Sequence, residues 1–289
     1  MGNLLQDIDW KDKTRDCDRL LESSLLKTEP IAPGFEAEVV RVHSGQDSLV
    51  LKIWNRQSRP DVGFQYRLLS VLYEQGIAVS RPLGWGKDAE GHFVLLTSYD
   101  GEPLMQLDDS VIAGLAVQLA RIHETDVIEG GKIELPLYSF KGYFYPQIEQ
   151  FPDLEEPLNQ LLPLVSLQQT AVIHGDYHLG NIVGQAGRHT IIDWTNAQWG
   201  DARYDFAWSH LLMELYVPQP YASLFETAYL LEHPIGLEVR QQFQALACIR
   251  WLLLYRHGHT PKADQLQQLL DQVVQRNPVL ASLGMPWTL

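Results

Sequence analysis

The stretch "AVIHGDYHLGNIV" (residues 171–183) carries the strongest structural and chemical signal in the chain. It places His174, Asp176 and His178 at alternate positions, with Asn181 five residues after the aspartate. On an extended strand, alternate residues point to one face, which is a pattern typical of a metal site. However, two glycines in the same stretch indicate a turning chain, and no second cluster of histidines and carboxylates supplies further ligands. A metal cage is therefore the weaker interpretation.

The alternative interpretation is a phosphoryl-transfer loop. The spacing from Asp176 to Asn181 is the D-x-x-x-x-N spacing of a kinase catalytic loop. Downstream, the run "TIIDW" ends an apolar strand in Asp193. A hairpin formed by Asn181–Val183 and Thr190–Asp193 would bring the three polar side chains to one edge. In phosphoryl transfer, a carboxylate orients the attacking hydroxyl, while an asparagine and a second aspartate bind the magnesium ions on the phosphates.

The first hundred residues favour a β-rich region with one helix. Strands are predicted at 35–42 and 48–54, around the turn "HSGQD", and again at 92–99. Apolar residues at helical spacing predict a helix over 62–76. The polar residues before 35 predict a loosely packed start, and "SRPLGW" reads as a connection that contains proline.

Beyond the short polar segment "YDGEPL" the pattern changes to long helices. An apolar stripe predicts a helix over 110–124, and a second stripe predicts a long core helix around 239–253. No strand is predicted after residue 206. The sequence thus predicts an α+β protein, with an N-terminal β-rich lobe at 1–99 and a larger helical lobe at 100–289.

Three motifs together resemble one known family. "HGDYHLGN", "IIDW" and "GDARYDFAW" are similar to the aminoglycoside phosphotransferase and choline kinase family, and the match runs from about Gly34 to Trp208. The resemblance implies a two-lobed, protein-kinase-like fold and an enzyme that uses ATP and Mg²⁺ to phosphorylate a hydroxyl of a small molecule. It makes Asp176 the catalytic base, and Asn181 and Asp193 the magnesium ligands.

The resemblance also implies supporting roles around this loop. His174 and His178 are expected to shape the loop. Asp201 and Asp205 are expected to hydrogen-bond it or to cap the helix that begins near Asp205.

On the nucleotide side, the resemblance places Lys52 of "LVLKIW" at the strand lysine that contacts the ATP phosphates. Its usual partner is a glutamate on the next helix, and this sequence has Gln65 there. A neutral amide can hydrogen-bond an ammonium group but cannot form an ion pair with it. This departure motivates an alternative function, a nucleotide-binding protein of the same fold with little or no kinase activity.

The remaining nucleotide contacts are expected from backbone groups. The phosphate-covering loop should lie at 31–39, where Gly34 is the one glycine. The adenine should be bound by backbone groups near Thr97, Ser98 and Tyr99.

The composition of the chain limits the kinds of molecule that it is expected to bind. The net charge of −14, from 22 basic and 36 acidic residues, argues against a nucleic-acid partner and fits a cationic substrate such as an amino sugar, an amino alcohol or an antibiotic. Five aromatic residues are candidates for a substrate-binding wall: Tyr138, Phe140, Tyr143, Phe144 and Tyr145.

The sequence also bears on location. No apolar run approaches the roughly 18 residues of a membrane span. The first residues lack the pattern of a leader segment, and the two cysteines lie far apart in the sequence. We therefore expect a cytoplasmic protein without a membrane partner.

Overall fold

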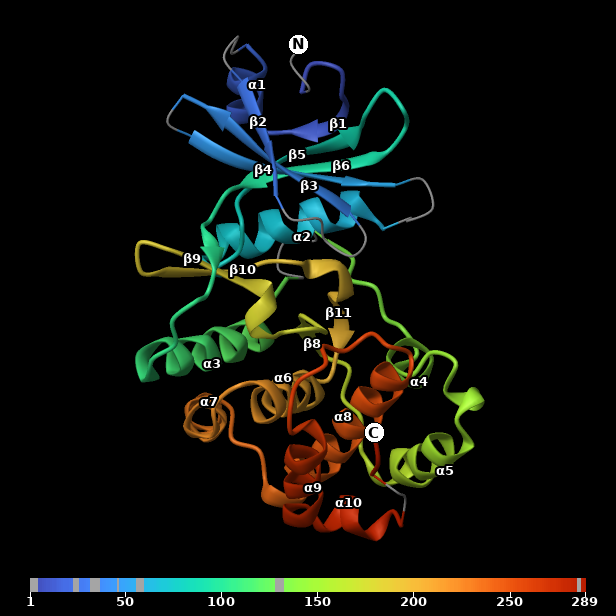
Figure 1. Cartoon of the computed structure of the whole chain (residues 1–289). Helices are drawn as coiled ribbons and strands as arrows, with labels where there is room; N and C mark the ends of the chain where they lie inside the picture. Colours follow the sequence, from blue (N-terminus) through green and yellow to red (C-terminus); the bar gives the residue numbers. More distant parts are fainter. Residues whose placement is uncertain are drawn as a thin grey trace. The chain divides into compact units, whose positions relative to one another are not determined.

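The computed structural model describes residues 5–22, 26–31, 37–45, 47–55, 60–127, 133–284 and 287–289 (Figure 1). The chain forms two compact units. Unit 1 comprises Met1–Leu104, Val127–Glu134 and Ile182–Thr195, and unit 2 comprises Met105–Asp126, Leu135–Asn181 and Asn196–Leu289.

Unit 1 is built on a six-stranded antiparallel sheet with the order β1-β5-β6-β4-β3-β2. Its central hairpin is continuous, with pairs running from Ala37↔Trp54 to Ser44↔Asp47. The strands are β1 (Asp9–Lys13), β2 (Leu26–Pro30), β3 (Ala37–Ser44), β4 (Asp47–Trp54), β5 (Pro82–Lys87) and β6 (Phe93–Ser98). The predicted hairpin and the predicted third strand are therefore confirmed.

The helix predicted over 62–76 is α2 (Val62–Glu74), which packs against β5 and β6. Asp61 caps it by accepting a hydrogen bond from the Phe64 amide at 2.8 Å. The chain leaves the helix through Gly76, whose φ of +76° suits glycine.

Two expectations for unit 1 were wrong. The polar start contains β1, α1 (Arg15–Leu21) and β2, and its Cys17 and Leu20 join the core of the sheet. The segment read as a connection holds β5, with Pro82 as its first residue. Both strands at the start lie at sheet edges, where pairing to a neighbour rather than an apolar pattern makes the strand.

A second, three-stranded sheet completes unit 1. β9 (Ile182–Gln185) and β10 (Arg188–Ile191) form an antiparallel hairpin, and β7 (Glu102–Pro103) pairs with β9. The predicted hairpin is thus present, although it begins one residue after Asn181 and ends before Asp193.

Unit 2 is mainly helical. Its helices are α3 (Asp109–Glu124), α4 (Phe140–Phe144), α5 (Pro152–Leu161), α6 (Ala202–Tyr216), α7 (Gln219–Glu232), α8 (Leu237–Arg256), α9 (Leu266–Arg276) and α10 (Pro278–Ser282). Two short strands, β8 (Ala171–Ile173) and β11 (Gln198–Gly200), pair antiparallel. Every element of the described chain after residue 206 is a helix, as the sequence predicts.

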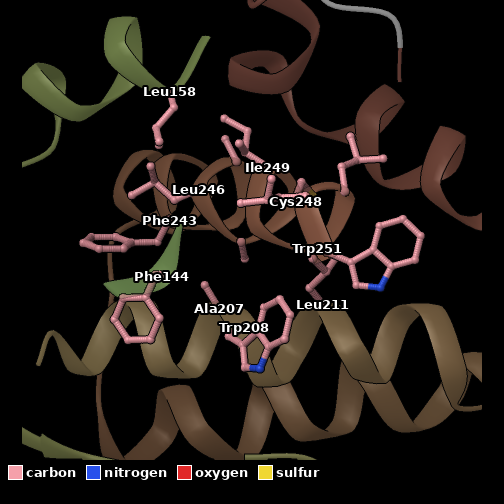
Figure 2. Close-up of a cluster of buried hydrophobic side chains, with 14 of the residues drawn as sticks. Phe144, Leu158, Ala207, Trp208, Leu211, Phe243, Leu246, Cys248, Ile249 and Trp251 are labelled. Carbon is pink, nitrogen blue, oxygen red and sulfur yellow. The ribbon is translucent and has the colours of Figure 1, made fainter. Parts of the chain in front are cut away.

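The long helix α8 lies within the core of unit 2 and contacts α5, α6 and α10. Phe243, Leu246 and Ile249 are buried in this cluster (Figure 2). Leu253 belongs to the same cluster. Residues 245–253 of α8 are all buried, and all except Arg250 are apolar, as expected of a helix covered all round. This core gives the second unit a firm base for the loop that follows β8. No helix among the described residues is long and apolar enough to cross a membrane.

Candidate active site

The loop after β8 turns sharply at Gly175, which has φ of +79°. A Cβ atom on this residue would lie 2.8 Å from both Cβ and O of Asn196, so only glycine fits. Because the chain turns here, His174, Asp176 and His178 do not lie along one straight strand. Among the described residues, no group with metal-ligand spacing includes them.

A buried carboxylate anchors this turn. Asp205 on α6 accepts hydrogen bonds from the backbone amides of His174 and Gly175, each at 2.9 Å. His123 Nε2 lies 3.1 Å from Asp205 Oδ2. Burial by itself raises the pKa of Asp205, but His123 and His174 outweigh it, so the net pKa is lowered. Asp205 is therefore an ionised group that holds the loop by its backbone, as the sequence analysis expected.

Asp201 has the second expected structural role. Its side chain caps α6 by accepting from the Arg203 amide at 3.0 Å. It also forms an ion pair with the Arg203 guanidinium and accepts from the Gln168 amide. The helix therefore begins at Ala202, three residues before Asp205.

Asp176 itself is held as a carboxylate. Its Oδ1 accepts a hydrogen bond from the indole Nε1 of Trp208 at 2.9 Å, and its Oδ2 lies 3.5 Å from Nε2 of His178. Burial by itself raises the pKa of this carboxyl. His178, the charge of Arg250 and the indole of Trp208 together lower it well below its usual value. A side chain that is ionised and 30% exposed can accept a hydrogen bond from a substrate hydroxyl.

Asn181 lies in the same loop and is tied back to it. Its amide nitrogen Nδ2 donates to the backbone oxygen of Asp176 at 2.9 Å, and its backbone amide donates to His178 O. The structure therefore brings Asp176 and Asn181 together. Because the nitrogen is used within the loop, the carbonyl oxygen Oδ1 is the atom that this side chain can offer to a metal ion.

Unit 1 brings Lys52 and Asp193 together. The Nζ of Lys52 on β4 lies 3.9 Å from Oδ1 of Asp193. Asp193 follows β10 with φ of +64°, a left-handed conformation that aspartate tolerates better than most residues and that is enriched at functional sites. Thr195 donates to its carboxylate at 2.7 Å, and the side chain is 48% exposed. An exposed carboxylate beside a lysine is suited to a phosphate-bound metal ion and its phosphate.

Gln65 lies on α2 and is 5% exposed. Between the described side chains of Gln65 and Lys52 there is no hydrogen bond. Within the described ranges, Lys52 forms an ion pair with Asp193 and none with a residue of α2.

The segment expected to bind adenine is already engaged in the sheet at two amides. The amide of Ser98 donates to Arg81 O at 2.9 Å, and that of Tyr99 donates to Ser48 O at 3.1 Å. Thr97 is buried on β6. Gly34, the candidate glycine of the phosphate loop, lies outside the described residues.

The five aromatic residues after Leu137 divide into two groups. Phe140, Phe144 and Tyr145 are buried in the core of unit 2. Tyr138 is 45% exposed, and its ring stacks on that of Tyr143 at 4.8 Å. Only these two reach the surface, so ordinary packing accounts for the other three.

Two residues beside Asp176 had no assigned role in the sequence analysis. Trp208 was part of a motif, but the side chain that its indole contacts, Asp176, lies 32 residues earlier in the sequence. Arg250 donates from both terminal nitrogens to Gly175 O, each at 3.2 Å. Both residues belong to helices whose apolar spacing predicts only packing, and no local pattern distinguishes them.

An antiparallel sheet with packed helices, a helical unit and a D-x-x-x-x-N loop together define a protein of the small-molecule kinase class. The model of the phosphotransferase enzyme family matches residues 27–243, and the chain belongs to this family. This match confirms the resemblance to the aminoglycoside phosphotransferases and choline kinases. No curated protein matches the sequence.

Solved structures with the same fold share little sequence with this chain. An amicoumacin kinase in complex with AMP-PNP and Ca²⁺ matches with a TM-score of 0.66 at 15% identity, covering 90% of each chain. An ethanolamine kinase from Plasmodium vivax matches with a TM-score of 0.64 at 15% identity, covering 93% of this chain and 87% of that chain. A choline kinase from Streptococcus pneumoniae matches with a TM-score of 0.58 at 16% identity, covering 93% and 97%. These matches confirm the protein-kinase-like α+β fold.

Proposed function

We propose that this chain transfers the terminal phosphoryl group of ATP, with Mg²⁺, to a hydroxyl of a small molecule. The observation that carries the proposal is the geometry of the Asp176 loop: Trp208 donates to the carboxylate of Asp176, and Asp205 and Arg250 hold the backbone beside it. In this proposal Asp176 accepts a hydrogen bond from the acceptor hydroxyl and orients its oxygen for attack. Because the pKa of Asp176 is lowered, this carboxylate is better suited to positioning the acceptor hydroxyl than to removing its proton before the transfer begins.

We also propose ligands for the nucleotide and for the metal ion. Lys52 binds phosphate oxygens, and Asp193 and the Oδ1 of Asn181 bind Mg²⁺, for which oxygen ligands are suited. The ion supplies positive charge that offsets the charge developing on the phosphoryl group. Gly34 and Gln65 are proposed to contribute to the nucleotide site.

The backbone near Thr97, Ser98 and Tyr99 is proposed to bind the adenine. Because the amides of Ser98 and Tyr99 are used in the sheet, their contribution would come from carbonyl oxygens. We keep 1–99 as the nucleotide-binding part of the chain and 100–289 as the part that binds and orients the acceptor.

For the acceptor we propose a cationic amino alcohol, amino sugar or antibiotic. Proteins with this fold include kinases of ethanolamine, choline and amicoumacin and a spectinomycin phosphotransferase. A net charge of −14 favours a cation. The stacked pair Tyr138 and Tyr143 offers exposed aromatic surface to such a group. We place the activity in the cytoplasm, with no membrane or nucleic-acid partner.

The direct test is a panel of acceptors incubated with ATP and Mg²⁺, with products measured by mass spectrometry. The panel contains ethanolamine, choline, homoserine, methylthioribose, a fructosamine, spectinomycin, an aminoglycoside and a macrolide. We expect one phosphorylated product, and a loss of turnover of at least about a hundredfold in Asp176→Asn. Asp264→Asn, which changes an exposed aspartate in the same unit, should retain full turnover.

The second candidate function is nucleotide binding without transfer, favoured by Gln65. Calorimetric titration with ATP, with and without Mg²⁺, separates the two candidates. Magnesium-dependent ATP binding without any product from the panel would favour the binding protein. Absence of magnesium-dependent ATP binding would contradict both functions.

A further inference from the structure

The indole of Trp208 contacts the side chain on which the proposed function rests. Its Nε1 donates to Oδ1 of Asp176 at 2.9 Å, although Trp208 lies on α6, within the buried core of unit 2 (Figure 2). We propose that Trp208 is a positioning residue that fixes the rotation of the Asp176 carboxylate, so that Oδ2 faces the acceptor hydroxyl. This inference rests on the proposed function.

The two carboxylate oxygens have different surroundings. Oδ1 is engaged by the indole, while Oδ2 faces Nε2 of His178 across a longer 3.5 Å. The Nδ1 of His178 accepts a hydrogen bond from the Gly180 amide at 3.0 Å, and its Nε2 also lies 3.3 Å from Nδ2 of Asn181, so Oδ2 shares this nitrogen with a second neighbour. Oδ2 is therefore the less tightly held oxygen and retains a lone pair for a substrate hydroxyl.

The hydrogen bond from the indole is needed because the last side-chain torsion of Asp176, χ2, has no strongly preferred value. Rotation of a carboxylate about its last bond is broad and roughly two-fold, so packing alone does not choose between the oxygens. A hydrogen bond to one oxygen from a rigid, buried ring does choose. In the resulting geometry, Oδ2 of Asp176 already faces the acceptor site before the substrate binds.

Arg250 holds the indole and the loop in one assembly. Its guanidinium lies 4.0 Å from the centre of a Trp208 ring and 4.7 Å from that of Phe144. The same group donates twice to the backbone oxygen of Gly175, the residue before Asp176. The buried guanidinium thus fixes the indole relative to the peptide that carries the carboxylate.

The chain contains a matched control for this contact. Trp251 on α8 lies in the same buried cluster as Trp208 (Figure 2), and its Nε1 donates to Tyr216 OH at 3.2 Å. Trp208→Phe and Trp251→Phe remove the same atoms from the same core. Only the first removes a hydrogen bond to Asp176.

The first experiment observes the contact without any ligand. Indole N–H resonances of the full ¹⁵N-labelled chain are recorded by NMR, and those of Trp208 and Trp251 are assigned by their absence in the two phenylalanine variants. In Asp176→Asn we expect the Trp208 resonance to shift and the Trp251 resonance to stay. An unshifted Trp208 resonance overturns the proposal.

The second experiment measures transfer from ATP to the panel compound that the unaltered protein phosphorylates. In Trp208→Phe we expect kcat to fall about tenfold to a hundredfold, the range for losing a hydrogen bond to a charged group. KM for ATP and for the acceptor should stay within about twofold, because the contact acts on orientation. Trp251→Phe should lose a similar amount of thermal stability and retain kcat within about twofold.

The outcomes separate the two proposals. If kcat falls equally in both variants, or stays unchanged in Trp208→Phe, the positioning role is wrong even though the enzyme is active. If the unaltered protein transfers no phosphate while the Trp208 resonance still responds to Asp176→Asn, the contact exists and the proposed function is the part that fails.

Discussion

Replacing Asp205 by asparagine tests whether one buried carboxylate holds the catalytic loop. The carboxylate accepts from the amides of His174 and Gly175 and faces Nε2 of His123, and it is buried. An asparagine of the same shape has one oxygen and one NH₂ group. Whichever way the amide is turned, at least one N–H of the loop or of His123 meets another donor.

The size of the effect follows from these contacts. An unsatisfied buried donor costs about 1–3 kcal/mol, and a hydrogen bond to a charged group is worth about 1.5–3 kcal/mol. These two costs apply together, because the amide both loses the charge and turns a donor toward another donor. We therefore expect Asp205→Asn to lower the free energy of unfolding by about 3–5 kcal/mol, with turnover lost in the fraction that stays folded.

The assay is urea unfolding followed by far-UV circular dichroism, with Asp153→Asn as the control. Asp153 forms a two-bonded ion pair with Arg256 at the surface, at 2.6 and 2.8 Å. Exposed pairs contribute about 0–1 kcal/mol, so the control should change the free energy of unfolding by no more than that. Equal effects of the two substitutions would refute the anchoring role of Asp205.

The pH dependence gives a second check. The net pKa of Asp205 is lowered, because His123 and His174 outweigh the effect of burial. A carboxylate with a lowered pKa stabilises the folded state fully above its unfolded pKa, about 3.9, and loses this contribution as the pH falls through the lower folded pKa. The stability difference between the unaltered protein and Asp205→Asn should thus shrink below about pH 4. A difference that stays constant on acidification would contradict the ionised state.

Two further substitutions test unit 1. Gly101→Ala should destabilise the protein by about 2 kcal/mol or more, because the φ of Gly101 is +117° and the new Cβ would lie 2.0 Å from Gly184 O. The control Gly45→Ala, at a φ of +61° with open space around the new Cβ, should cost only about 1–2 kcal/mol. Equal losses of stability in thermal unfolding would argue against the close approach at Gly101. Lys52→Met should raise the Kd for ATP about tenfold in calorimetry, with little change in thermal stability, since its contact with Asp193 is long and partly exposed; an unchanged Kd would remove Lys52 from the phosphate site.

The sequence predicts those elements that bury one face, because burial leaves a periodic pattern of apolar residues. β3, β4 and α2 were predicted because their apolar residues alternate or recur at helical spacing. β1 and β2 were missed because they are mostly exposed edge strands, formed by pairing with β5 and β3. The pairing of β1 with β5 brings together residues far apart in sequence, such as Asp9 and Lys87, and a local sequence pattern does not record it.

The same distinction applies to the site. Asp176 and Asn181 are five positions apart, so their spacing is itself the signal. The side chains that fix them come from distant segments, such as His123 at the end of α3 and Arg250 on α8. A histidine or an arginine on an apolar helix has many structural uses, and only the fold shows which backbone group it meets. The motif predicts the proposed chemistry, while the residues that position it become visible only in three dimensions.

Acceptor specificity is harder to predict for a related reason. The residues from Tyr138 to Tyr145 look alike in sequence, but their burial differs. Phe140 packs edge-on to Tyr204 of α6 at 4.7 Å, and the hydroxyl of Tyr145 donates to Leu246 O of α8. Helices α6 and α8 therefore cover Phe140 and Tyr145, but they do not cover Tyr138 and Tyr143, which lie at the surface. Because helix packing decides this division, the aromatic composition of the segment does not identify the acceptor, and Tyr138 and Tyr143 are the positions at which substitutions should change acceptor preference first.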